Sequence, residues 1–129
     1  AKAINIEAKT MIEMAAKQYI PSIIKYTTSL ADSVNQIKSA CPEATVSVQT
    51  ELLTKCSALL AKAQSALNTL IEVTDKGCAM EEGKEQAEFY RDSVFTAMSE
   101  LRTPIDELEM LVDKEYWPVP SYGDLIFEV

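Results

Sequence analysis

The apolar residues of this chain recur every three or four positions along three long stretches, which is the spacing of one face of an α-helix. The stretches run from about residue 5 to 39, from 47 to 76 and from 82 to 115. The third has the most regular repeat. Its members are Ala87, Tyr90 or Arg91, Val94, Met98, Leu101, Ile105, Leu108 and Val112. The pattern therefore predicts three helices of roughly 30 residues, each on the order of 45 Å long at about 1.5 Å per residue.

Short turn sequences separate the three stretches. The segment "SACPEATVS" has the small, polar and proline content of a turn between the first two helices. The segment "DKGC" places Gly77 at the left-handed position that commonly ends a helix. Glu81, Glu82 and Glu85 then suit the first turn of the third helix, where the helix dipole favours negative charge. Short connections predict that successive helices run in opposite directions.

Two prolines fall inside the predicted helices, Pro21 in the first and Pro104 in the third. Proline removes a backbone donor and crowds the preceding turn, so each is expected to kink its helix. The expected fold is thus all-α: an elongated up-down-up bundle of three long helices, forming a single domain over residues 1–129, with an extended tail over 116–129.

Composition narrows the function classes. The chain has 129 residues, enough for one domain, with 12 basic and 20 acidic side chains and a net charge of −8. Such a charge disfavours nucleic acid and anionic lipid as partners. The absence of histidine removes the commonest general base and the commonest nitrogen ligand for zinc. No uncharged apolar run approaches the roughly twenty residues that span a bilayer.

The three cysteines, Cys41, Cys56 and Cys78, have neither a disulfide-framework nor a metal-knuckle spacing, which favours reduced thiols and a cytoplasmic location. Cys56 lies on the apolar stripe of the second helix and is interpreted as a small hydrophobe.

Clustered carboxylates raise the hypothesis of a small carboxylate metalloenzyme. However, Asp106, Glu107, Glu109 and Asp113 fall between the apolar positions of the third helix, where a solvated face is expected. No glycine-rich phosphate loop is present either. The sequence therefore predicts no catalytic residue, no metal ligand and no cofactor-binding residue in this chain.

The last residues, "KEYWPVPSYGDLIFEV", differ from everything before them. Pro118 and Pro120 favour an extended path after the third helix. The large apolar side chains near the end gain about 1.5–3 kcal/mol each on full burial, so they need a partner surface. The residues predicted to dock are Tyr116, Trp117, Pro118, Tyr122, Leu125, Ile126, Phe127 and Val129. Their partner is either the bundle itself or another domain or subunit.

The C-terminal stretch "ELRTPIDELEMLVDKEYWPVPSYGDLIFEV" resembles the end of the type III glutamine synthetases, a large bacterial form of the enzyme. The stretches "NIEAKTMIEMAAKQYIPSIIKY" and "AEFYRDSVFTAMSELRTPID" also resemble the C-terminal region of that family. The resemblance covers nearly the whole chain and is weakest over residues 39–49 and the second helix. It implies an excised C-terminal helical domain, which also accounts for the start at Ala1.

The resemblance implies a parent enzyme that joins ammonia to glutamate with ATP and divalent magnesium or manganese, in a large cytoplasmic oligomer. No stretch of this chain matches the catalytic motifs of the family. The expected function is therefore a non-catalytic structural and assembly domain, whose partners are the catalytic domain of the same chain and neighbouring subunits. The alternative is a free-standing acidic helical bundle that offers a groove to a helical protein partner.

Overall fold

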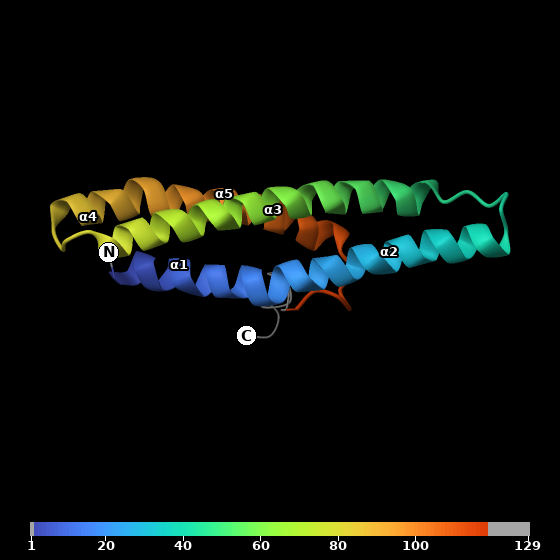
Figure 1. The fold of residues 1–129 in the computed structure, drawn as a ribbon, viewed down its shortest axis with the longest axis horizontal. Coiled ribbons are helices and arrows are strands. Elements are labelled where there is room, and N and C mark those ends of the chain that lie inside the picture. The colour runs from blue at the N-terminus through green and yellow to red at the C-terminus, as the bar shows by residue number, and fades with distance from the viewer. Residues whose placement is uncertain (1, 119–129) are drawn as a thin grey trace.

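The computed structural model describes residues 2–118, and the regular structure in this part of the chain is entirely helical (Figure 1). The expected all-α class is confirmed. Three helical runs follow one another. The first comprises α1 (Lys2–Met14), the π-helical segment η1 (Ala15–Tyr19) and α2 (Ile20–Ala40); the second is α3 (Ser47–Ala79); the third comprises α4 (Lys84–Phe89), the π-helical segment η2 (Tyr90–Val94) and α5 (Phe95–Leu111).

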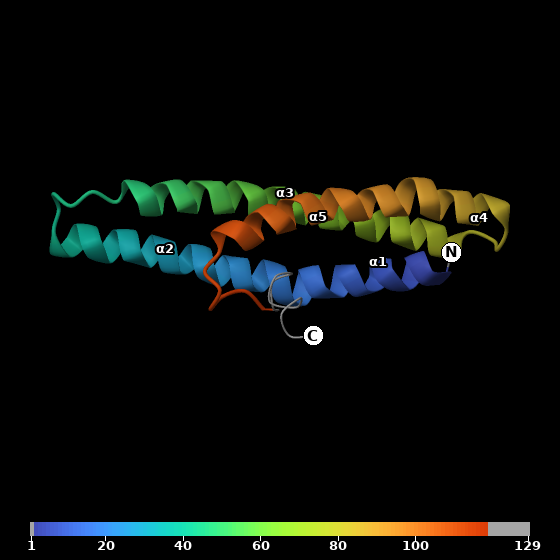
Figure 2. The same cartoon turned by 180° about the vertical axis from the view of Figure 1, so that it is seen from behind.

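The runs lie side by side in a long, narrow arrangement, with α3 packed against both α2 and α5 (Figures 1 and 2). The third run is shorter than the other two, so the hairpin formed by α2 and α3 extends well past the end of α5. One end of the molecule therefore has three layers of helix and the other has two.

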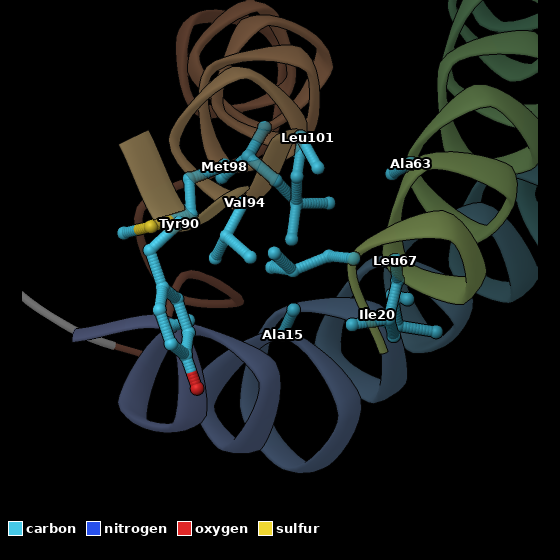
Figure 3. Close-up of a cluster of buried hydrophobic side chains, with 12 residues drawn as sticks. Ala15, Ile20, Ala63, Leu67, Tyr90, Val94, Met98 and Leu101 are labelled. Atoms are coloured by element: carbon cyan, nitrogen blue, oxygen red, sulfur yellow. The ribbon is translucent and has the colours of Figure 1, made fainter. Parts of the chain in front are cut away.

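Two clusters of buried side chains follow the apolar stripes. The larger joins α1, η1, the start of α2, α3, η2 and α5 (Figure 3). Its members are Ala8, Ala15, Ile20, Ala63, Leu67, Leu70, Tyr90, Val94, Ala97, Met98, Leu101 and Ile105. The smaller lies nearer the hairpin and contains Ile23, Tyr26, Leu30, Cys56, Leu108 and Val112. A spacing of three and four residues thus places one face of each helix in a common core.

The backbone widens to a π-helical turn directly before Pro21. The N–H of Ile20 donates to the carbonyl of Ala15, five residues back. Proline cannot donate and its ring crowds the carbonyl four residues earlier, so a wider turn accommodates it while the helical run continues. Pro104 is buried within α5. A change of helix direction at these two prolines stays a prediction.

Gly77 does not end the second helix in a left-handed conformation, and that expectation is wrong. The helix continues to Ala79, and the glycine with positive φ in the described chain is Gly83, at 148°. The end of α3 is instead closed by Gln86, whose side-chain amide donates to the carbonyls of Gly77 (3.0 Å) and Met80 (3.2 Å). The Gly77 carbonyl also accepts the N–H of Met80 at 3.2 Å, so a side chain of the next helix adds donors at a helix end where intrahelical donors run out.

Gly77 permits close packing between α3 and the third run. A Cβ at this position would lie 3.1 Å from Cζ of Tyr90 and 3.3 Å from Cδ2 of Phe89. We expect Gly77→Val to lower the free energy of unfolding by about 1–3 kcal/mol, because overpacking forces both rings to move. Urea denaturation measures the change. The matched control is Ala79→Val, in the same helical turn but exposed; equal losses in the two variants would show that the close approach carries no cost.

The third run ends at Leu111, four residues before the expected end at 115. Asp113 accounts for the difference, because its Oδ1 accepts a hydrogen bond from the N–H of Glu115 at 3.0 Å. Aspartate side chains compete in this way with the helical backbone. The N–H groups of Tyr116 and Trp117 then bond to the carbonyls of Asp113 and Lys114 in a separate turn. That turn directs the chain back across the first helical run.

Candidate docking surface

Two aromatic residues after α5 pack on two tyrosines of the first helical run. The rings of Tyr116 and Tyr26 have centroids 5.5 Å apart and are tilted by 58°. The rings of Trp117 and Tyr19 are 5.1 Å apart and tilted by 41°. Aromatic pairs at these centroid separations are favourable when the rings are not stacked squarely face to face, because the negatively charged faces of the two rings repel each other. The hydroxyl of Tyr26 also lies 3.4 Å from the carbonyl oxygen of Leu111, to which it donates.

Trp117 joins the two halves of the core. Its half-buried ring contacts both the larger and the smaller cluster of buried side chains. Its indole Nε1 is buried and has no hydrogen-bond partner among the described residues. An N–H in that position costs free energy unless an acceptor reaches it. Trp117 thus anchors the returning chain, and its indole N–H has no acceptor within residues 2–118.

A groove of about 410 Å³ opens between α1 and α5, beginning at Tyr19. Its lining is Ile6, Glu7, Thr10, Met11, Met14, Tyr19, Met98 and Arg102. A smaller cavity of about 150 Å³ adjoins it and shares Met11, Tyr19 and Arg102. Together the two form one depression, here called the α1–α5 groove, with mainly apolar walls and a single basic side chain, Arg102. Aromatic contact with Trp117 places the returning chain at one end of this groove.

A second groove, of about 460 Å³, lies where α5 ends on the surface of α3. Lys55, Ala58, Leu59, Glu107, Met110 and Leu111 line it. Met110 is 87% exposed, the most exposed of the large apolar side chains in the described chain. This groove borders the two-layered hairpin end of the molecule.

A polar cluster closes the opposite end of the bundle. The Tyr90 hydroxyl lies 3.4 Å from Oδ1 of Asn5 and 3.4 Å from the Cys78 sulfur, and Cys78 lies 3.2 Å from the same Asn5 oxygen. Burial, followed by the hydrogen bond and charge of Cys78, raises the pKa of Tyr90 to about 12. Burial also raises the pKa of the Cys56 thiol. Both groups are therefore held in their neutral forms.

The Tyr90 pKa predicts a loss of stability at high pH. In the unfolded chain tyrosine ionises near pH 10, whereas in the folded chain it holds its proton to about pH 12. Between those values the unfolded state binds fewer protons, so the free energy of unfolding falls as pH rises. We expect Tyr90→Phe to flatten this decline in urea unfolding between pH 10 and 12. The two chains differ only at the tyrosine, and parallel declines would contradict the assignment.

The carboxylates of the third run face solvent. Asp106, Glu107 and Asp113 are exposed and Glu109 is half-buried. After burial, the charges of Glu109 and Asp106 are the next causes of a raised pKa at Tyr19. Within residues 2–118 no group of three or more histidine, cysteine, aspartate or glutamate side chains is placed to hold a metal ion. None of the helices within residues 2–118 combines the length and the apolar composition that a membrane span requires.

The sequence-predicted docking residues fall into two groups. Tyr116 and Trp117 are half-buried at the surface just described, and Pro118 is exposed beside them. Tyr122, Leu125, Ile126, Phe127 and Val129 lie outside the described residues. Sequence reasoning missed Tyr26 as a partner of the returning chain, although its spacing of seven from Tyr19 places the two rings on one helical face. It also missed the groove residues Ile6 and Arg102, for which a single sequence carries no signal.

Comparison with known proteins matches this chain to glutamine synthetases. Residues 1–38 match the Glutamine synthetase C-terminal domain family. The whole chain is 32% identical to glutamine synthetase from Butyrivibrio fibrisolvens, and 96% of it is 26% identical to glutamine synthetase from Bacteroides fragilis. Type-3 glutamine synthetase from Dictyostelium discoideum is 30% identical over 98% of the chain. In each case the chain spans 18% of the relative's length.

Proposed function

We propose that this chain, a C-terminal region of a glutamine synthetase, is a non-catalytic domain that serves the structure and assembly of the enzyme. The observation that carries the proposal is the match along the full chain to a region that makes up 18% of glutamine synthetases. The remaining four-fifths of such a protein leaves ample room for the catalytic machinery. In this proposal the catalytic residues lie in the remaining four-fifths of the protein, and this chain contributes to its structure and assembly.

The arrangement of the described residues supports an assembly role. The buried side chains form a core that draws on all three helical runs, so the domain holds its own shape. The side chains that remain exposed include large apolar ones, among them Ile6, Phe95 and Met110. Exposed apolar surface of this kind marks contacts with other domains or subunits. Most carboxylates of the described helices are exposed, and no three of them gather where they could hold a metal ion.

The proposal extends to the parent protein. The parent protein would ligate ammonia to glutamate with ATP and a divalent metal, magnesium or manganese, and would act as a cytoplasmic homo-oligomer. Its type III character and bacterial source belong to the same proposal. The partners of this domain would be the catalytic domain of its own chain and the neighbouring subunits. The up-down-up bundle, kinked at Pro21 and Pro104, would supply a rigid arm that holds the tail from Tyr116 to Val129 at a contact surface.

An activity assay tests the non-catalytic part of the proposal. The purified 129-residue chain is given glutamate, ammonia, ATP and magnesium or manganese, and glutamine is measured. We expect none above the rate without protein, while the full-length enzyme carrying the same chain forms glutamine under the same conditions. Glutamine formation by the isolated chain would refute the non-catalytic assignment.

The second groove favours a rival function. Met110 and Leu111 lie beside Leu59 in a largely apolar depression. Such a surface fits the apolar face of a helix from a partner protein, as a free-standing interaction module would require. That module would exist in its source cells as a protein of this chain's mass, 14.3 kDa, whereas the domain would not.

A further inference from the structure

The α1–α5 groove leaves apolar side chains open to solvent on the face of the bundle that the returning chain reaches. Ile6 is 64% exposed, and Met11 and Met14 are half-buried. Met98 lines the groove from α5. Methionine side chains adapt to irregular partners, so these walls suit an apolar segment without a fixed secondary structure.

The rest of this chain is within reach of the groove. Trp117 contacts Tyr19, which lines the groove, and residues 119–129 follow it. Ile6 lies 13 residues before Tyr19 along the first helical run, which corresponds to about 20 Å at about 1.5 Å per residue. A chain segment of 11 residues spans at most about 36–40 Å. The segment is therefore long enough to follow the groove from one end to the other.

The chemistry of the segment matches the groove. Leu125, Ile126 and Phe127 offer apolar side chains to the methionine walls. Asp124 and Glu128 are acidic, and the one basic side chain of the groove is Arg102. Glu7 and Asp106 also border the groove and would repel these acids, so the favourable position for either acid is at Arg102.

The buried indole of Trp117 adds an independent observation. Its Nε1 lacks an acceptor among the described residues. A carbonyl or carboxylate oxygen of the segment that follows Trp117 would supply one, and would remove the cost of burying the donor.

We propose that residues 119–129 bind in the α1–α5 groove of their own chain, with the apolar side chains of 125–127 on Met11, Met14 and Met98 and an acidic side chain at Arg102. This inference deepens the proposed function, since it identifies the surface that the tail covers. A tail held in cis would present a finished surface to the catalytic domain or a neighbouring subunit.

Photo-crosslinking tests the position of the tail. Phe127→p-benzoylphenylalanine is introduced into the 129-residue chain, which is irradiated and digested with trypsin. Cleavage at lysine and arginine yields the tail as peptide 115–129, and the methionines proposed to contact residues 125–127 lie in peptides 10–17 and 92–102. We expect crosslinks from the tail peptide to these two wall peptides, in material that runs as a monomer. A crosslinker at the exposed Val48, on the hairpin, should reach neither of the two.

Other crosslinking results overturn the proposal. Crosslinks confined to dimers would mean that a second copy supplies the tail. Intrachain crosslinks only to peptides that hold no groove residue, or a yield no higher than in urea, would mean that the groove does not bind it. These outcomes do not decide the assembly role, which is measured by the oligomeric state of the full-length enzyme. Docking of the tail in the groove can therefore be refuted while the assembly role is confirmed, and the reverse.

Thiol labelling provides a second measurement with a matched control. Thr10→Cys places a thiol in the groove, and Thr69→Cys places one on exposed α3; both chains carry Cys41→Ser and Cys78→Ser. We expect Thr10→Cys to react about tenfold slower than in the same chain with Leu125→Asp and Phe127→Asp, which corresponds to about 1.4 kcal/mol of docking free energy. Thr69→Cys should react equally in both backgrounds. An unchanged Thr10→Cys rate would overturn the proposal.

Discussion

Leu101→Ala is expected to lower the free energy of unfolding by about 2–5 kcal/mol, the range for removing a buried leucine side chain from a packed core. Leu101 is 1% exposed and lies among the side chains that join α3 and α5, near Leu67 and Val94 (Figure 3). Because Leu101 is almost completely buried, the surrounding side chains relax only partly after the truncation. The substitution therefore leaves a cavity, whose cost adds to the lost transfer free energy. Urea denaturation of the 129-residue chain measures the change.

Met110→Ala is the control for this substitution. Met110 lies on the same helix and is 87% exposed, and its truncation removes a side chain of similar size. A change within about 0.5 kcal/mol is expected there, as for most surface positions. If both variants lost the same stability, the division of α5 into a buried and an exposed face would be wrong.

In the full-length protein that carries this chain, proposed above to be a glutamine synthetase, removal of residues 116–129 is expected to disrupt the proposed oligomer. The deletion removes the aromatic contacts of Tyr116 and Trp117 with the first helical run, together with every predicted docking residue of the tail. Size-exclusion chromatography with light scattering reports the assembly, and glutamine formation reports the activity. We expect subunits or partial assemblies with reduced activity.

A point variant separates assembly from simple loss of folding. Trp117→Ala should cost about 1–3 kcal/mol of stability, from lost apolar burial and one aromatic pair. It should weaken the oligomer in the same direction as the deletion. Lys62→Ala is the control, because Lys62 is exposed on α3 and belongs neither to the docking surface nor to the exposed apolar side chains. A truncated enzyme that assembles and works normally would show that the assembly role is wrong.

The helices were predictable because burial imposes a period that is visible in the sequence. Val94, Met98, Leu101, Ile105 and Leu108 recur at steps of three and four, and all are buried. Ala87 continues the pattern, near the start of the third run, but is exposed. The spacing of apolar residues therefore identifies one face of a helix, but not how much of that face other helices bury.

The ends of the helices depended on contacts that local sequence does not contain. The segment "DKGC" is typical of a helix end, but Gly77 lies within α3, where its lack of a side chain lets Tyr90 and Phe89 pack closely. The end of α3 is instead hydrogen-bonded by Gln86 of the following helix. The end of α5 follows from a hydrogen bond of Asp113 to the backbone two residues on. In both places a polar side chain ended or closed the helix, where periodicity alone favoured a different boundary.

The docking surface was predictable only in part. An apolar, aromatic tail indicated that Tyr116 and Trp117 need a partner, since their side chains are costly to expose. The identity of the partner rings, Tyr19 and Tyr26, depended on where the chain turns after Leu111. The α1–α5 groove depended on the spacing between two helices that are more than 70 residues apart in sequence, which no local pattern encodes.

The most direct test of the central claim is the native mass of the protein that carries this chain. An antibody against residues 1–118 captures it from its source cells, and the captured material is weighed by native mass spectrometry and assayed for glutamine formation. The account predicts a species several-fold heavier than 14.3 kDa that makes glutamine from glutamate, ammonia and ATP. A native protein of about 14.3 kDa without that activity would contradict the account and establish the free-standing binding bundle instead.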